Sequence, residues 1–204
     1  MLVQITPPAV EPITLAQARL HLKLTADDPT NEDSLIEGVW IPAARSHAEM
    51  VTARSFITQG WRLVMDSFPG LIQLERGPVQ RIDSIVYRDT GGVSRTIAWA
   101  APVDGIQRST DGTLIADLTS GVVATAFGAT GPIVLPELGA LAVNYTAGYG
   151  DTAAAVPQGI KQWLLLRIGA LYENREEVLT GSGVSFAAMP FVDSLLAPYS
   201  IVSA

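Results

Sequence analysis

The spacing of the apolar residues changes twice along this chain of 204 residues, and that change limits the possible folds more than any other feature. Near both ends the apolar residues recur every three to four positions, the period of a helix that buries one face. In the middle they alternate with polar residues, the period of a half-buried strand. The sequence therefore predicts an α+β fold in which a β domain, residues 57–149, is inserted into a helical domain formed by residues 1–56 and 150–204.

The predicted helices cover residues 14–23, 30–55 and 157–177. The first begins with a capping box, because Thr14 and Gln17 can each satisfy a free backbone N–H group of the other. Pro42 lies inside the second and cannot donate a hydrogen bond to the carbonyl of Gly38, so we expect a kink there. The predicted apolar stripe of the second helix consists of Leu35, Ile36, Val39, Ala43, Met50 and Val51.

The third predicted helix is apolar around almost its whole circumference. Its core stripe consists of Ile160, Trp163, Leu164, Ile168, Leu171 and Tyr172. Leu165, Leu166 and Gly169 cover much of the remaining surface. A helix of this kind must be buried on several sides, and a second protein molecule is a natural source of that cover. We therefore expect a subunit interface that includes Trp163, Leu165, Leu166 and Gly169.

The middle of the chain contains several strand-like runs, separated by turn signals rich in glycine and proline. These runs cover residues 61–66, 71–74, 82–87, 94–99, 113–118, 122–127 and 141–146. The clearest hairpin signal is Asp89-Thr90-Gly91-Gly92, which lies between two of the runs. The inserted domain is therefore predicted to be antiparallel.

Composition excludes several classes of protein. The net charge is −7 and the 13 lysine and arginine residues are scattered, which argues against a protein that wraps nucleic acid. The chain has no cysteine, no apolar run close to the roughly 20 residues of a membrane span, and no N-terminal pattern of a secretion signal. We expect a globular protein made in a cytoplasm, with an acidic surface past which DNA could slide without being gripped.

Motifs that could carry catalysis have simpler structural explanations. Residues 148–153 match the glycine pattern of a dinucleotide site, but the next helix begins late and too few residues follow for further strand–helix units. The acid-rich residues 27–33 lack the spacing of a calcium loop and suit a helix start. His21 and His47 lie on predicted helices, and Gly181-Ser182-Gly183 is not a nucleophile elbow. We therefore predict no catalytic, cofactor-binding or metal-binding residues, and a protein that is not an enzyme.

The order of short segments along the chain is similar to that of a known family. The segments are Glu11-Pro12-Ile13-Thr14-Leu15-Ala16-Gln17-Ala18, Glu32-Asp33-Ser34-Leu35-Ile36, Ile57-Thr58-Gln59-Gly60-Trp61, Tyr145-Thr146-Ala147-Gly148-Tyr149-Gly150, Tyr172-Glu173-Asn174-Arg175-Glu176 and Leu195-Leu196-Ala197-Pro198-Tyr199. With this order the chain resembles the head–tail connector, or adaptor, proteins of tailed bacteriophages, prophages and gene-transfer particles. It resembles the branch that carries a β insertion between its helices. The likeness spans nearly the whole chain and departs from the family pattern at Pro42 and across residues 100–136.

The resemblance implies a structural role in the neck of a virion. The helical core is expected to assemble into a ring, expected to be dodecameric, beneath the portal protein. Such a ring would extend the channel for genomic DNA and offer a docking surface to a stopper or tail-completion protein, with no cofactor and no membrane.

The resemblance also implies that the end of the chain binds clefts between portal subunits. The expected portal-binding residues are Pro198, Tyr199, Ile201 and Val202. Pro198 would end any helix and send the chain out extended, so that it could pair with the portal like an added strand. For residues 191–196, folding back on the helices of the same chain is the alternative.

Two other functions stay open at this point. One is a binding module of a phage tail or baseplate, in which the β domain reads a receptor. The other is a small hydrolase, which would need a pocket that gathers His21 or His47 with an acid and a serine.

Overall fold

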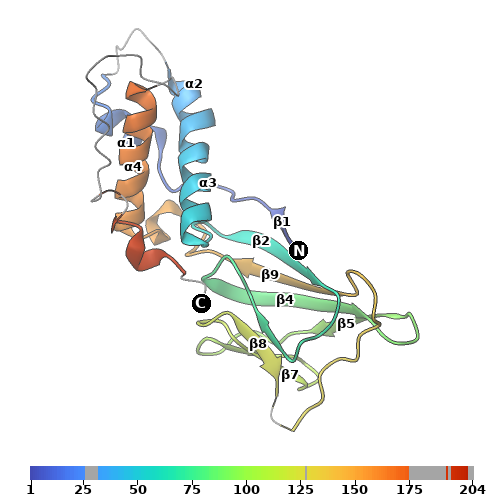
Figure 1. Ribbon diagram of the computed structural model, residues 1–204. Helices are drawn as coiled ribbons and strands as arrows, with labels where there is room; N and C mark the ends of the chain where they lie inside the picture. The colour runs from blue at the N-terminus through green and yellow to red at the C-terminus, as the bar shows by residue number, and fades with distance from the viewer. Residues whose placement is uncertain (26–31, 127, 175–191, 193, 202–204) are drawn as a thin grey trace. The chain divides into compact units, whose positions relative to one another are not determined.

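The structure, a computed structural model, describes residues 1–25, 32–126, 128–174, 192 and 194–201 (Figure 1). It divides into two compact units. The β unit consists of Met1–Ala9 and Ile57–Asp151, and the helical unit consists of Val10–Phe56 and Thr152–Ala204. The α+β class predicted from the sequence is confirmed, and strands outnumber helices in the described part of the chain.

Two longer helices, with shorter segments around them, form the helical unit (Figure 1). The α-helices are α1 (Leu15–His21), α2 (Asp33–Leu35), α3 (Ile41–Thr52) and α4 (Gln158–Glu173). Three further turns are η1 (Ile36–Trp40), η2 (Ala153–Ala155) and η3 (Ala197–Tyr199). The predicted first and third helices are therefore a few residues too long, and residues 175–177 of the third lie outside the described residues.

The predicted capping box at the start of α1 is present. The backbone N–H of Gln17 donates to Thr14 Oγ1 over 3.2 Å, and the backbone N–H of Thr14 donates to Gln17 Oε1 over 3.0 Å. Two N–H groups that the helix itself leaves unpaired are satisfied in this way.

The second predicted helix contains a π-helical turn just before Pro42. Residues Ile36–Trp40 form a π-helical turn between α2 and α3, and Pro42 lies in the first turn of α3. The wider π turn before it gives room at the point where proline cannot donate to the preceding turn. The π turn contains an extra residue relative to an α turn, so the positions that face inward along α3 differ from those of an uninterrupted α-helix.

The β unit contains two antiparallel sheets (Figure 1). The five-stranded sheet has the order β1-β2-β9-β4-β5, and the four-stranded sheet has the order β3-β8-β7-β6. The strands of the first are β1 (Leu2–Thr6), β2 (Gln59–Met65), β4 (Val79–Arg88), β5 (Ser94–Ala98) and β9 (Leu141–Ala147). The strands of the second are β3 (Leu71–Gln73), β6 (Ile106–Arg108), β7 (Leu114–Asp117) and β8 (Val122–Thr125).

The two sheets enclose one hydrophobic core. Ile85 and Val143 contribute to it from the five-stranded sheet, and Leu114 and Val123 from the four-stranded sheet. Along β9 every second residue is buried, as the alternating pattern predicts. Tyr145 is fully buried, and its hydroxyl donates to the backbone carbonyl of Glu75 over 2.8 Å. Burial raises the pKa of this hydroxyl.

The predicted hairpin between β4 and β5 is confirmed. Arg88 pairs with Ser94 at its closed end. The Asp89 carboxylate accepts hydrogen bonds from the backbone N–H groups of Gly91 and Val93, each over 3.0 Å, and from Arg95 Nε over 2.9 Å. Asp89 thus organises the turn, and the hydrogen bond from Arg95 is the largest cause that lowers its pKa.

Two strands were not predicted. Strand β1 pairs with β2, so residues Met1–Ala9 belong to the β unit rather than to the helical part of the chain as expected. Strand β6 lies in the region where the family pattern is lost. Both strands are short, and such runs give little periodic signal by themselves.

Candidate functional site

The helical unit is the candidate site, because it contains the residues predicted to contact a second subunit and the portal. Its core lies between α3 and α4, which contact each other. Ile41, Ala44 and Ala48 of α3 are buried, as are Ile160, Leu164 and Ile168 of α4.

Trp163 lies inside the unit rather than on its surface. Its side chain is only 4% exposed, and its ring stacks on that of His47 with centroids 5.8 Å apart and an angle of 3° between the planes. Trp40 and Tyr172 make a second ring contact, edge to face, with centroids 5.8 Å apart. These rings hold α4 to the segment that contains α3.

The other predicted interface residues of α4 are partly accessible. Leu165 and Leu166 are half-buried, and Ala170, one turn after Leu166, is exposed. Gly169 is half-buried against α1: a side-chain carbon there would lie 3.4 Å from His21 Nε2. The missing side chain of Gly169 therefore serves contact within the chain, and Leu165 and Leu166 are the predicted residues that a partner could reach.

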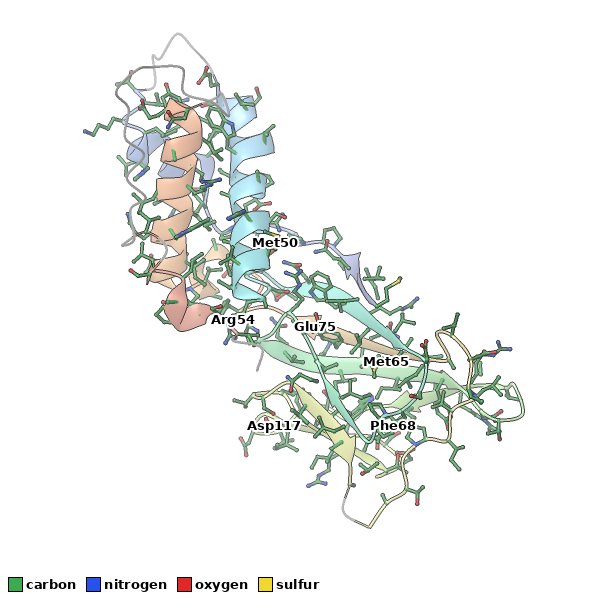
Figure 2. The ribbon with its side chains drawn as sticks, in the orientation of Figure 1. Met50, Arg54, Met65, Phe68, Glu75 and Asp117 are labelled. Atoms are coloured by element: carbon green, nitrogen blue, oxygen red, sulfur yellow. The ribbon has the colours of Figure 1, made fainter. Side chains whose placement is uncertain are left out.

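The end of the described chain is docked on its own helical unit. Leu196 is 3% exposed, Tyr199 packs against Gly159 at the start of α4, and the backbone N–H of Ile201 donates to the carbonyl of Thr52 over 3.0 Å. Arg54 Nε also donates to the carbonyl of Tyr199; Figure 2 labels Arg54.

The prediction that Pro198 ends all helical structure is therefore wrong. Pro198 lies inside the turn η3, where its fixed φ is tolerated. Pairing of this segment with the portal stays a prediction.

Some predicted portal-binding residues stay accessible in this docked segment. Pro198 is exposed, Ile201 is 42% exposed, and Tyr199 is half-buried. Val202, residues 175–191 and residue 193 lie outside the described residues, and so does the loop with Gly181-Ser182-Gly183.

An ion-pair network that was not predicted, formed by Glu11, Arg45 and Glu49, lies on the inner side of α3. Arg45 Nε donates to Glu11 Oε2 over 2.7 Å, and Arg45 Nη1 donates to Glu49 Oε2 over 2.9 Å. The other oxygen of Glu49 accepts the backbone N–H of Phe56 over 2.8 Å. Burial lowers the pKa of Arg45, but the hydrogen bonds and charges of Glu11 and Glu49 outweigh it, so the pKa is raised overall.

The predicted apolar stripe of the second helix is buried only in part. Ile36 is fully buried, but Val39 is 51% exposed, Met50 is 62% exposed and Val51 is 49% exposed. Ala43 is exposed as well. For the four exposed residues the expectation that they face the chain's own core is wrong. The π turn changes which positions face inward, and the Arg45–Glu49 pair occupies part of the inner side.

The glycine pattern at residues 148–153 has a structural role. Gly148 has φ +141°, and a side-chain carbon there would lie 2.5 Å from the carbonyl oxygen of Ile57. Glycine is thus required by close backbone contact within the β unit. The segment continues into the short turn η2 rather than directly into a long helix, which is not the geometry of a dinucleotide site.

The two histidines are placed by packing. His21 lies against Gly169, and His47 stacks on Trp163. Within the described part of the chain, there is no group of three or more histidine, aspartate or glutamate side chains that could hold a metal ion. In the same part, no helix is both long enough and apolar enough to cross a membrane.

Solved structures share this architecture, a helical unit together with a β unit of two sheets, along the whole chain. One is the neck of an empty gene transfer agent (GTA) particle computed with C6 symmetry, in which the matching chain is 26% identical with a TM-score of 0.75. Another is the virion of a native GTA particle, with 26% identity and a TM-score of 0.74. Each match covers 100% of this chain and 97% of the other.

A third structure supports the fold alone. It is the neck of a native GTA particle computed with C12 symmetry, with 23% identity, a TM-score of 0.72 and the same coverage. No family model and no curated protein matches the chain. The neighbours confirm the resemblance to head–tail connector proteins of phage-like particles, and they agree with the predicted non-enzymatic role and location in a virion neck.

Proposed function

We propose that this chain is a subunit of a ring in the neck of a phage-like particle, between the portal and a stopper or tail-completion protein. The observation that carries the proposal is the match over the whole chain to components of GTA particles, two of them described as necks and computed with C6 and C12 symmetry. A ring of twelve copies is compatible with both symmetries. The net charge of −7 suits a channel through which DNA slides without being held.

The proposed contact between subunits involves the accessible side of α4. Leu165 and Leu166 are half-buried in the single chain, so a neighbouring subunit could cover what remains accessible. A closed ring requires a heterologous contact, in which two different surfaces of the subunit meet. Trp163 and Gly169 support this surface from within the chain.

The proposed contact with the portal involves the docked end of the chain. Pro198 and Ile201 are accessible, and Val202 continues the segment beyond the described residues. Tyr199 holds the segment to α4 through its contact with Gly159. In this proposal the portal therefore binds residues 198–201 as part of a folded unit, not as a free extended tail.

Particles produced without this chain test the proposed function. A missing neck ring should leave heads and tails that form separately and do not join, and supplying the chain in trans should restore complete particles. Electron microscopy of the products counts tailed particles and free heads. Complete tailed particles at the normal frequency without the chain would contradict the proposal.

A further inference from the structure

The outward face of α3 and of the turn before it has an unusual composition for a solvent-exposed helix face. Its exposed positions are Glu37, Gly38, Val39, Ala43, Ser46, His47, Met50 and Val51. Neither lysine nor arginine is among them, and Glu37 is the single carboxylate. We call Val39, Ala43, Met50 and Val51 the α3 stripe; Figure 2 labels Met50.

The charged side chains of α3 itself point the other way. Arg45 is half-buried and paired with Glu11 and Glu49, and Glu49 is 7% exposed. A surface helix normally turns its charges to water and its apolar residues to the core. Here the Arg45–Glu49 pair lies inside the helical unit while the α3 stripe faces outward. The described residues of the chain therefore leave this apolar stripe largely uncovered.

Small residues along this face suit close approach by another helix. A side-chain carbon at Gly38 would meet nothing within 4 Å, and Ala43 and Ser46 follow on the same face. Short side chains let the axes of packed helices come closer together. DNA is a poor occupant, because its phosphates require lysine or arginine.

A second copy of the chain is the occupant that the observations favour. The chain matches proteins in necks computed with C6 and C12 symmetry, and a ring requires two different complementary surfaces on each subunit. The half-buried Leu165 and Leu166, with the exposed Ala170 one turn after Leu166, are apolar residues that α4 keeps partly accessible, and the α3 stripe provides an apolar surface on a different helix. We infer that the α3 stripe of one subunit receives the Leu165–Leu166 side of α4 from the next subunit.

This inference rests on the proposed ring, and disulfide trapping tests it in assembled particles. The chain has no cysteine, so a disulfide between two copies can form only at the introduced thiols. One variant carries Ala43→Cys on the stripe together with Ala170→Cys on α4. Mild oxidation of its particles should give a ladder of multimers of this chain on a non-reducing gel.

Single variants identify which surfaces meet. Ala43→Cys alone and Ala170→Cys alone should stay monomeric, and particles built from a mixture of the two should give dimers. The matched pair Ala154→Cys with Ala170→Cys, in which the exposed Ala154 replaces the stripe position, should give no ladder. Dimers from Ala43→Cys alone would overturn the inference in favour of contact between two α3 stripes.

The remaining outcomes separate this inference from the proposed function. A disulfide within a single chain would show that the chain covers its own stripe and would overturn the inference. Rings seen at the neck without any ladder would overturn the inference and leave the proposed function standing. Particles whose necks lack the chain would overturn both.

A substitution in the stripe gives an independent readout. Met50→Asp should leave the melting temperature of the free protein nearly unchanged, because the side chain is 62% exposed there, but should reduce incorporation into necks at least tenfold. The matched change Leu138→Asp, at a position that is 90% exposed in the β unit, should leave incorporation unchanged. Normal incorporation of Met50→Asp would overturn the inference.

Discussion

At the scale of single residues, short polar side chains fix the turns of the β unit. Asp111 Oδ1 accepts hydrogen bonds from Ser109 Oγ over 2.6 Å, from Thr113 Oγ1 over 2.8 Å and from the backbone N–H of Thr113 over 3.0 Å. The hydrogen bond from Ser109 is the largest cause of the lowered pKa of Asp111. The ionised carboxylate therefore stabilises the folded turn before β7.

Replacing Asp111 should remove the part of the folding stability that depends on the ionisation of its carboxylate. Asp111→Ala should lower the free energy of unfolding by about 1 kcal/mol at neutral pH, because these hydrogen bonds are lost. The folded pKa is lowered, so the contribution of the carboxylate is present above the ordinary value of about 3.9 and is lost as the pH falls through the folded pKa. Urea unfolding over a series of acidic pH values should show the difference from the original protein shrinking. A difference that stays constant or grows towards acid would contradict this account.

At the scale of elements, close backbone approach explains why glycine follows β9. Gly148→Ala should lower the free energy of unfolding by at least about 2 kcal/mol, because φ is +141° and the new carbon would lie 2.5 Å from the carbonyl oxygen of Ile57. Gly38→Ala is the control, since its new carbon meets nothing within 4 Å, and it should change stability by no more than about 1 kcal/mol. Denaturant unfolding of both variants measures the effect, and equal effects would contradict the assignment.

The sequence predicted elements well where their signal is local and periodic. The capping box of Thr14 and the hairpin after β4 depend on neighbouring residues, and both are present. Strand β1 was missed because its place depends on pairing with β2, far along the chain. An uninterrupted α-helical period through residues 36–40 predicts burial of the α3 stripe, but these residues form a π turn.

The candidate site was predicted less fully, because it also depends on contacts between distant parts of the chain. Leu165 and Leu166 are half-buried and stay predicted interface residues, whereas Trp163 is buried and stacks on His47, which lies on another helix. Pro198 was expected to end all helical structure, whereas a 3₁₀ turn accommodates it. Tertiary contacts of this kind leave no periodic signal in the sequence.

At the scale of the whole molecule, the docked end of the chain connects the helical unit to its proposed portal contact. Ile201→Asp should leave the melting temperature within a few degrees of the original, because the side chain is 42% exposed. It should nevertheless weaken retention on portal-bearing heads, since an apolar contact is replaced by a charge that lacks a partner. Sedimentation of heads mixed with the protein measures retention. Retention equal to that of the original protein would show that Ile201 does not contact the portal.

The central claim is that copies of this chain form a closed ring in the neck of a particle. Cryo-electron microscopy of particles that contain the chain, reconstructed at the neck without imposed symmetry, tests it most directly. The account predicts a closed ring of this chain next to the portal, twelve copies in number, with helical units in contact around the DNA channel. Density for the chain at a tail tip or baseplate, with none in the neck, would contradict it.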